Sequence, residues 1–218
     1  MEKDTQRVED FELGEPVLVC RWRIAGGRLP LENRHLRAFS RRTVAGRGVT
    51  TQLLSWAKQH IEWTLADGSA DCPDGVLMIA MDEQGRAAMS VGPYAELPAR
   101  DVAALAARAE ESRREAAEAG VAPETFWTVR GGGLVCAAAD DAVASGAASL
   151  VADLAKTLGI EVSRDGGLLD EALAGKAPEQ AFLCSDEHGI VVASDAEGDV
   201  AQRFADAYAK LLASERAK

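Results

Sequence analysis

Residues 145–162 read SGAASLVADLAKTLGIEV. The pattern predicts a helix from about Ser145 to Leu158, because Gly159 is a residue favoured just past helix C-termini. Ile160–Ser163 follows as a short strand. A helix that begins here leaves backbone N–H groups free at Gly146 and Ala147, where an anion can bind.

The remainder of the second half also alternates helices and strands. Residues 101–119 are rich in Ala, Glu and Arg, and their charges fall at i,i+4 spacing, as on the solvated face of a helix. A glycine run, residues 131–133, reads as a turn and lacks the downstream pattern of a phosphate-binding loop. The predicted elements are a helix at 101–119, a strand at 126–129, a hairpin of 180–184 with 189–194, and a final helix at 200–212.

The first half has its own strands and helices. The segment 92–98 carries two prolines and reads as a linker, which divides the chain into an N-terminal domain at 1–95 and a C-terminal domain at 100–218. The alternation in both halves predicts mixed α and β layers. The predicted elements are a strand at 16–24, a helix capped by Asn33, a helix starting near Thr50, and a hairpin of 76–82 with 86–91.

Composition narrows the class of protein. The chain has 218 residues, 47% of them hydrophobic, so a packed core is expected. The formal net charge of -11 argues against nucleic-acid binding, which needs clustered Lys and Arg. The longest apolar run, 76–81, is too short to span a bilayer. Met1–Gly14 is polar and acidic, unlike a signal peptide, so the cytoplasm is the expected compartment.

The cysteines and histidines do not suggest a metal site. Four cysteines lie far apart without a CxxC pair, and the three histidines are equally scattered. Ser185-Asp186-Glu187-His188 contains a nucleophile, acids and a base, but neighbours in a turn rarely face one another, so we interpret it as a polar hairpin tip. No catalytic residues are predicted.

Several segments resemble class IV pyridoxal-phosphate (PLP) enzymes, which include branched-chain aminotransferases and 4-amino-4-deoxychorismate lyases. Residues 112–120, SRREAAEAG, resemble the helix that follows the cofactor lysine in that family. Residues 145–162 resemble its phosphate-binding turn, helix and strand. Residues 182–186, FLCSD, with Gly189-Ile190 are similar to the strand and turn that complete the phosphate site. Weaker similarities run in the same order at Gly27-Arg28, His35-Leu36, Ser40, Tyr208 and Leu211-Leu212.

The resemblance implies an α+β fold of two domains. A small N-terminal α+β domain and a C-terminal barrel-like α/β domain would hold the PLP pocket between them. The resemblance also implies a homodimer, because the pockets of this family lie near the subunit interface.

The lysine that holds PLP in that family has no counterpart. Its position falls at Asp101 or Val102, and neither side chain can form an imine. The sequence has no lysine between Lys58 and Lys156, so a small shift of the alignment does not restore one. Lys156 lies within a helix and is interpreted as a surface charge.

The phosphate contacts are also altered. The family places an arginine where this chain has Ala38, although Arg37 and Arg41 lie nearby and are interpreted first as solvated charges. Asp186 stands where the family has a threonine, and a carboxylate repels a phosphate. The residues that would still receive a cofactor or small anion are Gly146, Ala147, Ala148, Ser185, Asp186, Arg37 and Arg41.

The carboxylate that keeps the pyridine nitrogen protonated aligns with either Ala137 or Glu124. About a dozen residues are missing between Val135 and Ser145 relative to the family, so both alternatives stay open.

Three hypotheses follow. In the first, the chain is a divergent class IV homologue that has lost PLP and catalysis and uses its cleft for another ligand, such as a small anion. In the second, it is an active aminotransferase or lyase with a displaced lysine. In the third, it is an unrelated α+β protein that binds a small ligand or a partner. The substrate is not revealed.

Overall fold

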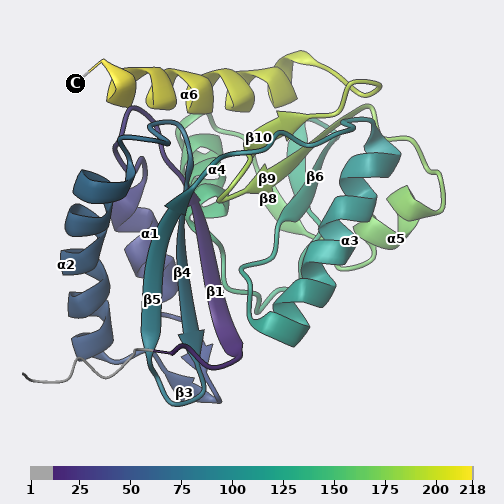
Figure 1. Ribbon diagram of the computed structural model, residues 1–218. Coiled ribbons are helices and arrows are strands. Elements are labelled where there is room, and N and C mark those ends of the chain that lie inside the picture. Colours follow the sequence, from purple (N-terminus) through teal and green to yellow (C-terminus); the bar gives the residue numbers. More distant parts are fainter. Residues whose placement is uncertain (1–11, 218) are drawn as a thin grey trace, which may run out of the picture.

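The computed structural model describes residues 12–217, so most of the polar N-terminal segment considered above lies outside the described residues. The first half is built on an antiparallel sheet of order β1-β4-β5, made of β1 (Pro16–Arg23), β4 (Val76–Asp82) and β5 (Ala87–Gly92). Figure 1 shows this sheet beside helix α2 (Thr51–Gly68). The remaining elements of this half are α1 (Glu32–Phe39) and the short pair β2 (Thr43–Val44) and β3 (Arg47–Gly48).

Successive side chains of a strand point to opposite faces of the sheet, which explains how this sheet buries one face. Leu18, Cys20 and Trp22 of β1 join one apolar cluster with side chains of β4 and α2. Helix α2 starts near Thr50 as predicted, and Thr50 caps it, since its hydroxyl accepts a hydrogen bond from the Leu53 N–H (3.2 Å). The predicted cap of α1 is wrong: Asn33 lies inside the first turn, and the chain enters the helix through Leu31 in a left-handed conformation (φ 63°).

The second half contains a sheet of order β10-β9-β6-β7-β8. All pairs are antiparallel except β7 with β8. The predicted barrel-like domain takes the form of an open sheet, with β10 and β8 at its edges among the described residues. The strands are β6 (Thr125–Arg130), β7 (Gly133–Cys136), β8 (Val162–Arg164), β9 (Gln180–Ser185) and β10 (Gly189–Val192).

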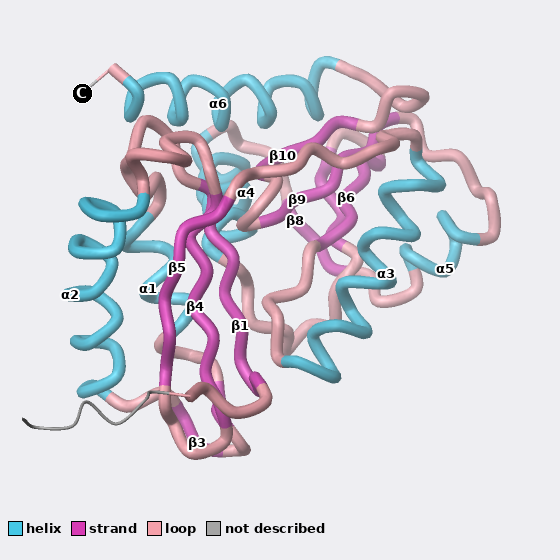
Figure 2. The backbone as a smooth tube through the Cα atoms, viewed as in Figure 1, coloured by secondary structure: helices cyan, strands magenta, loops and turns pink. Residues whose placement is uncertain are grey.

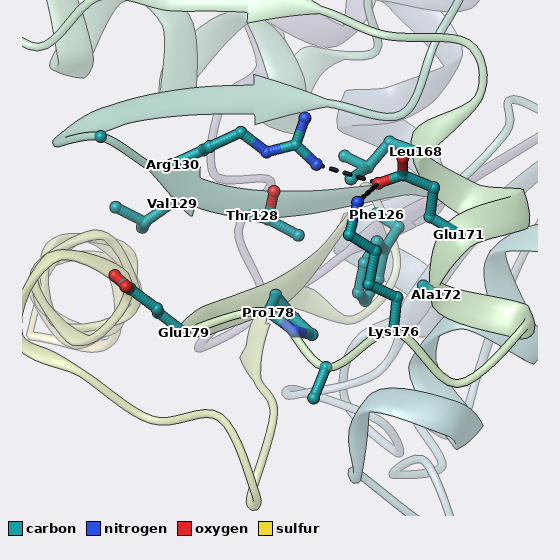
Figure 3. Close-up of a pocket in the computed structure, with 12 residues that line it drawn as sticks. Phe126, Thr128, Val129, Arg130, Leu168, Glu171, Ala172, Lys176, Pro178 and Glu179 are labelled. Carbon is teal, nitrogen blue, oxygen red and sulfur yellow. Dashed lines mark hydrogen bonds and ion pairs between the residues drawn. The ribbon is translucent and has the colours of Figure 1, made fainter.

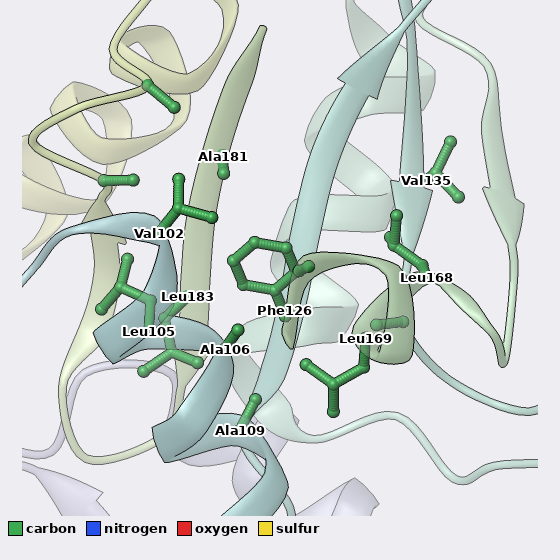
Figure 4. Close-up of a cluster of buried hydrophobic side chains, with 14 residues drawn as sticks. Val102, Leu105, Ala106, Ala109, Phe126, Val135, Leu168, Leu169, Ala181 and Leu183 are labelled. Carbon is green, nitrogen blue, oxygen red and sulfur yellow. The ribbon is translucent and has the colours of Figure 1, made fainter. Parts of the chain in front are cut away.

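Helices cover both faces of this second sheet. Figure 2 shows α3 (Val102–Ala119) and α5 (Leu168–Leu173) together beside it. Phe126 of β6 packs in the cluster of α3 and α5, which Figure 4 shows, whereas the next residue, Trp127, packs against the other face. That other face is covered by α4 (Gly146–Thr157) and α6 (Asp199–Arg216). Within the described residues, no helix is long and apolar enough to cross a membrane.

The two halves contact each other at several points. The Arg23 N–H at the end of β1 donates to the Asp186 carbonyl (2.9 Å), which lies just beyond β9. Helix α6 extends across both halves in Figure 1, and its Arg216 Nε lies 2.7 Å from an oxygen of Asp74 in the first half. Helices α1 and α4 also pack together, which brings residues of the first half to the start of α4.

Candidate functional site

The start of helix α4 holds an anion that belongs to the protein itself. Ser145 caps the helix, and its hydroxyl accepts a hydrogen bond from the Ala148 N–H (3.2 Å). The next two N–H groups, of Gly146 and Ala147, donate to the carboxylate of Asp186 at 3.3 and 2.7 Å. A carboxylate is favoured here because the N–H groups and the helix dipole both present positive charge. Asp186 therefore fills the place where the sequence predicts a bound anion.

His35 of α1 completes the surroundings of this carboxylate. Its Nδ1 lies 3.5 Å from Asp186 Oδ2, and only 2% of the His35 side chain is exposed. The imidazole also stacks on the ring of Trp22, with centroids 5.0 Å apart. Burial by itself would raise the pKa of Asp186. His35 and the two amides together lower it by more than burial raises it, so the pKa of Asp186 lies below the ordinary value. The Asp186 carboxylate is thus held in its charged form.

The approach of His35 to α4 depends on a glycine. A β-carbon at Gly146 would come within 2.9 Å of His35 Cε1 and closer still to Nδ1. Gly146 therefore serves close packing as well as exposing its N–H group. The α4 start, Asp186 and His35 form a compact arrangement, which we call the carboxylate cup.

The structure divides the predicted site residues into two groups. It brings Gly146, Ala147 and Asp186 together, whereas Arg37 and Arg41 are exposed on and just after α1 and make no contact with Asp186. The arginine of α1 that does reach α4 is Arg34. Its Nη1 donates to Ser149 Oγ (3.2 Å) and Asp153 Oδ2 (2.7 Å).

Sequence reasoning missed Arg34 and the role of His35, since the crossing of α1 and α4 is a tertiary contact. Their only signal in the sequence is the His35-Leu36 resemblance. Of the remaining predicted residues, Ala148 donates its N–H to the Ser145 cap, and the Ser185 hydroxyl donates to the carboxylate of Glu124, which lies 61 residues away in the sequence.

The positions expected for a cofactor lysine have structural roles. The side chain of Asp101 caps α3 and accepts a hydrogen bond from the Ala104 N–H (2.9 Å). Val102 is buried in the apolar cluster of α3 and α5. The lysines of the described part of the chain are all exposed: Lys58, Lys156, Lys176 and Lys210.

One of these lysines lines a cavity, shown in Figure 3. Lys176 Nζ lies 3.0 Å from Glu171 Oε2, and Arg130 binds the same carboxylate. The cavity is lined by Phe126 and α5, so it lies on the sheet face opposite the one that α4 covers. Lys176 is thereby separated from the carboxylate cup by the sheet.

A second polar cluster lies next to the cup, around Glu124. This buried carboxylate receives hydrogen bonds from Arg108 Nε (2.9 Å) and Ser185 Oγ (3.0 Å). Ala137, the alternative position for a pyridine-nitrogen partner, is a buried alanine in the apolar cluster of α3 and α5. Of the two positions, only Glu124 therefore offers a carboxylate, and that carboxylate is already paired.

The space between the halves is small at this point. A cavity bordered by Arg21, Glu124 and Asp186 measures about 10 Å³, roughly the size of one water molecule. The expected inter-domain cleft is therefore nearly closed here. A cavity of about 420 Å³ lies within the second half, in the size range of small-molecule pockets. Its walls are mainly apolar and include Trp127, Ala138 and Val143.

Comparisons with known proteins identify the fold of this chain. No protein-family model matches the chain, and no curated protein matches it. Solved structures do match. A hypothetical aminotransferase from Mycobacterium tuberculosis in PLP-bound form shares 14% identity with a TM-score of 0.60, over 96% of each chain. An aminotransferase from Brucella abortus bound to PLP shares 14% with a TM-score of 0.59, over 92% of this chain and 93% of that one.

A 4-amino-4-deoxychorismate lyase from Pseudomonas aeruginosa shares 18% identity with a TM-score of 0.50, over 87% of this chain and 88% of that one. The chain therefore has the mixed α and β fold of class IV aminotransferases and aminodeoxychorismate lyases. At these identities the likeness defines the fold, and activity depends on the site.

Proposed function

We propose that this protein is a divergent member of the class IV aminotransferase and lyase group that does not use PLP and does not carry out Schiff-base chemistry. Its fold would serve as a scaffold for binding another ligand. The observation that carries this proposal is the hydrogen bonding of the Asp186 carboxylate to the Gly146 and Ala147 amides.

The electrostatics of the cup support the proposal. A phosphate at the start of α4 would have to displace the Asp186 carboxylate or lie beside it. Two unit charges about 4 Å apart repel by roughly 4 kcal/mol at an effective dielectric of 20. His35 closes the same space from the side of α1, within 3.5 Å of Asp186. The residues present do not fit the phosphate of PLP.

The positions of the described lysines support the same conclusion. An imine needs an unprotonated amine within bonding distance of the aldehyde. The described lysines are exposed, and the one beside a cavity, Lys176, is paired with Glu171 on the opposite sheet face. Asp101 and Val102 occupy the expected position with a cap and an apolar contact.

Covalent labelling tests the proposal. The protein is incubated with PLP, reduced with borohydride, digested and examined by mass spectrometry, in parallel with the variants Lys156→Arg and Lys176→Arg. We expect only scattered, partial labelling of exposed lysines in all three proteins. Stoichiometric labelling at one lysine, abolished when that lysine is replaced, would establish the alternative of an active enzyme with a displaced lysine.

A positive role as a small-ligand protein has its own support. The cavity of about 420 Å³ beside Trp127 and Val143 is large enough for a small, mainly apolar molecule. Replacing Ala148, one of its lining residues, by Trp would fill part of this space. A screen of apolar ligands by thermal shift should give stabilised wild-type protein and unchanged Ala148→Trp protein.

We also propose a homodimer and a cytoplasmic location. The dimer rests on the resemblance to class IV enzymes, and light scattering at micromolar concentration tests it, with a monomer mass as the contrary result. The location is supported by the cysteines, which are all free thiols in the structure, as is usual in reducing compartments.

A further inference from the structure

The tertiary structure brings together three metal-ligating side chains that are not adjacent in sequence. Glu124 precedes β6, and Glu187 with His188 lies in the turn between β9 and β10. One ligand atom from each of these residues lies within 4.8 Å of the other two. This cluster is separate from the carboxylate cup, because Asp186 is turned toward α4.

His188 provides an independent observation. Its side chain is only 8% exposed, and its Nδ1 is buried without a hydrogen-bond partner among the described residues. Its Nε2 lies 3.7 Å from Glu124 Oε1, too far for a hydrogen bond. A buried imidazole with an unpartnered nitrogen, beside two carboxylates, offers the type of ligand atom that a transition metal binds.

Ser185 connects the turn that carries Glu187 and His188 to the carboxylate of Glu124. Ser185 Oγ accepts hydrogen bonds from the N–H groups of Glu187 (3.1 Å) and His188 (3.0 Å), which shapes the turn. The same hydroxyl donates to Glu124 Oε1 (3.0 Å), linking the turn to β6. Such outer contacts orient the ligands of protein metal sites.

Two nearby arginines contact these carboxylates. Arg108 Nε binds Glu124 Oε2 at 2.9 Å, and Arg21 Nη1 lies 3.8 Å from Glu187 Oε2. Glu124 Oε1 also accepts a hydrogen bond from Ser185 Oγ (3.0 Å) and lies 3.5 Å from Arg108 Nη2, so a bound cation would share this oxygen with both groups. Arg23, which stacks over Tyr94, adds a further positive charge nearby. These charges weaken cation binding, so we expect lower affinity than in structural zinc sites.

We propose that Glu124, Glu187 and His188 form a binding site for a divalent transition metal of the zinc class. One imidazole and two carboxylates supply three protein ligands, and water would take the fourth tetrahedral position. The mixed nitrogen and oxygen ligands favour Zn²⁺ over Mg²⁺, which prefers oxygen alone.

Calorimetric titration of the metal-free, full-length protein with Zn²⁺ tests the proposal. The variants His188→Asn and Glu187→Gln remove one ligand each, and His60→Asn, on the surface of α2, is the matched control. We expect saturable binding of one Zn²⁺ per chain in the wild type and in His60→Asn. We expect a loss of affinity greater than the roughly tenfold typical of losing an outer-shell partner in the two ligand variants.

Circular dichroism establishes that both ligand variants are folded. Mg²⁺ titrated into the wild type should give much weaker binding than Zn²⁺. Absence of saturable Zn²⁺ binding in the wild type, or unchanged affinity in folded His188→Asn and Glu187→Gln, would overturn the proposal.

Discussion

The carboxylate of Asp186 accepts a hydrogen bond of 2.7 Å from the backbone N–H of Ala147, at the first turn of α4. The two residues belong to different elements of the second half, and His35 of the first half contacts the same carboxylate. One side chain therefore joins the start of a helix, the end of a strand and the other half of the molecule.

Replacing Asp186 by Thr should free the amides of Gly146 and Ala147 for an external anion. Inorganic phosphate should then raise the melting temperature of Asp186→Thr and leave that of the wild type unchanged. Binding to the folded state alone stabilises by about 2.7 kcal/mol at a hundredfold excess over Kd. A folded Asp186→Thr protein whose melting temperature is independent of phosphate would contradict this account of the cup.

The charge of Asp186 should make stability depend on pH. Because its folded pKa is depressed, its contribution is present above the ordinary aspartate pKa of about 3.9 and is lost as the pH falls through the folded value. Asp186→Asn should therefore cost about 3 kcal/mol near pH 7, as expected for breaking a buried pair. The difference from the wild type should shrink below about pH 4. Urea unfolding at several pH values measures this difference, and a constant gap down to pH 2.5 would refute the assignment.

Gly146→Ala should destabilise the protein although alanine is the better helix former. The new methyl group would press on His35, 2.9 Å from Cε1, and disturb its stacking on Trp22. We expect a loss of about 1–3 kcal/mol, as for other overpacked sites. Gly48→Ala is the control, since a β-carbon there meets nothing within 4 Å, and its unfolding free energy should barely change. Equal effects of the two substitutions would argue against close packing at Gly146.

Arg108 should matter more than its neighbour Arg113 on the same helix. Arg108→Ala leaves the buried Glu124 without its cation, and we expect a loss of about 2 kcal/mol or more in unfolding free energy. Arg113 is exposed and pairs with the half-buried Glu110 at 3.5 Å, so Arg113→Ala should cost less than about 1 kcal/mol. Chemical denaturation of both variants at low and moderate salt measures the contrast, which should persist in salt because the Glu124 pair is buried.

Local chemistry allowed many of the element boundaries to be predicted. Helix starts were predicted near Thr50, Asp101 and Ser145, and in the structure each of these side chains accepts a hydrogen bond from the N–H group three residues ahead. The start of α1 was missed because a left-handed turn at Leu31 precedes it. Helix α5 was also missed, and its six residues are too few to show a clear period.

The sequence also predicted several residues of the candidate site, but not how those residues contact one another. It predicted that Asp101 or Val102 stands at the position of the family's lysine, that the amides of Gly146 and Ala147 lie at a helix start, and that Asp186 stands where the family was expected to have a threonine. It predicted repulsion between Asp186 and a phosphate, but could not show that Asp186 itself binds the amides. It named Arg37 and Arg41 and did not consider Arg34, because the sequence of a helix does not show which face will meet α4.

The sequence by itself thus determined the class of fold and most of the longer helices and strands, since these depend on residue identity and short-range spacing. Only the tertiary structure decided that His35 and Gly146 enclose Asp186, and that Glu124 lies beside Glu187 and His188. These contacts form when α1 packs on α4 and β9 pairs with β6. Their physical origin is the burial of apolar faces, which determines which distant polar groups share a site.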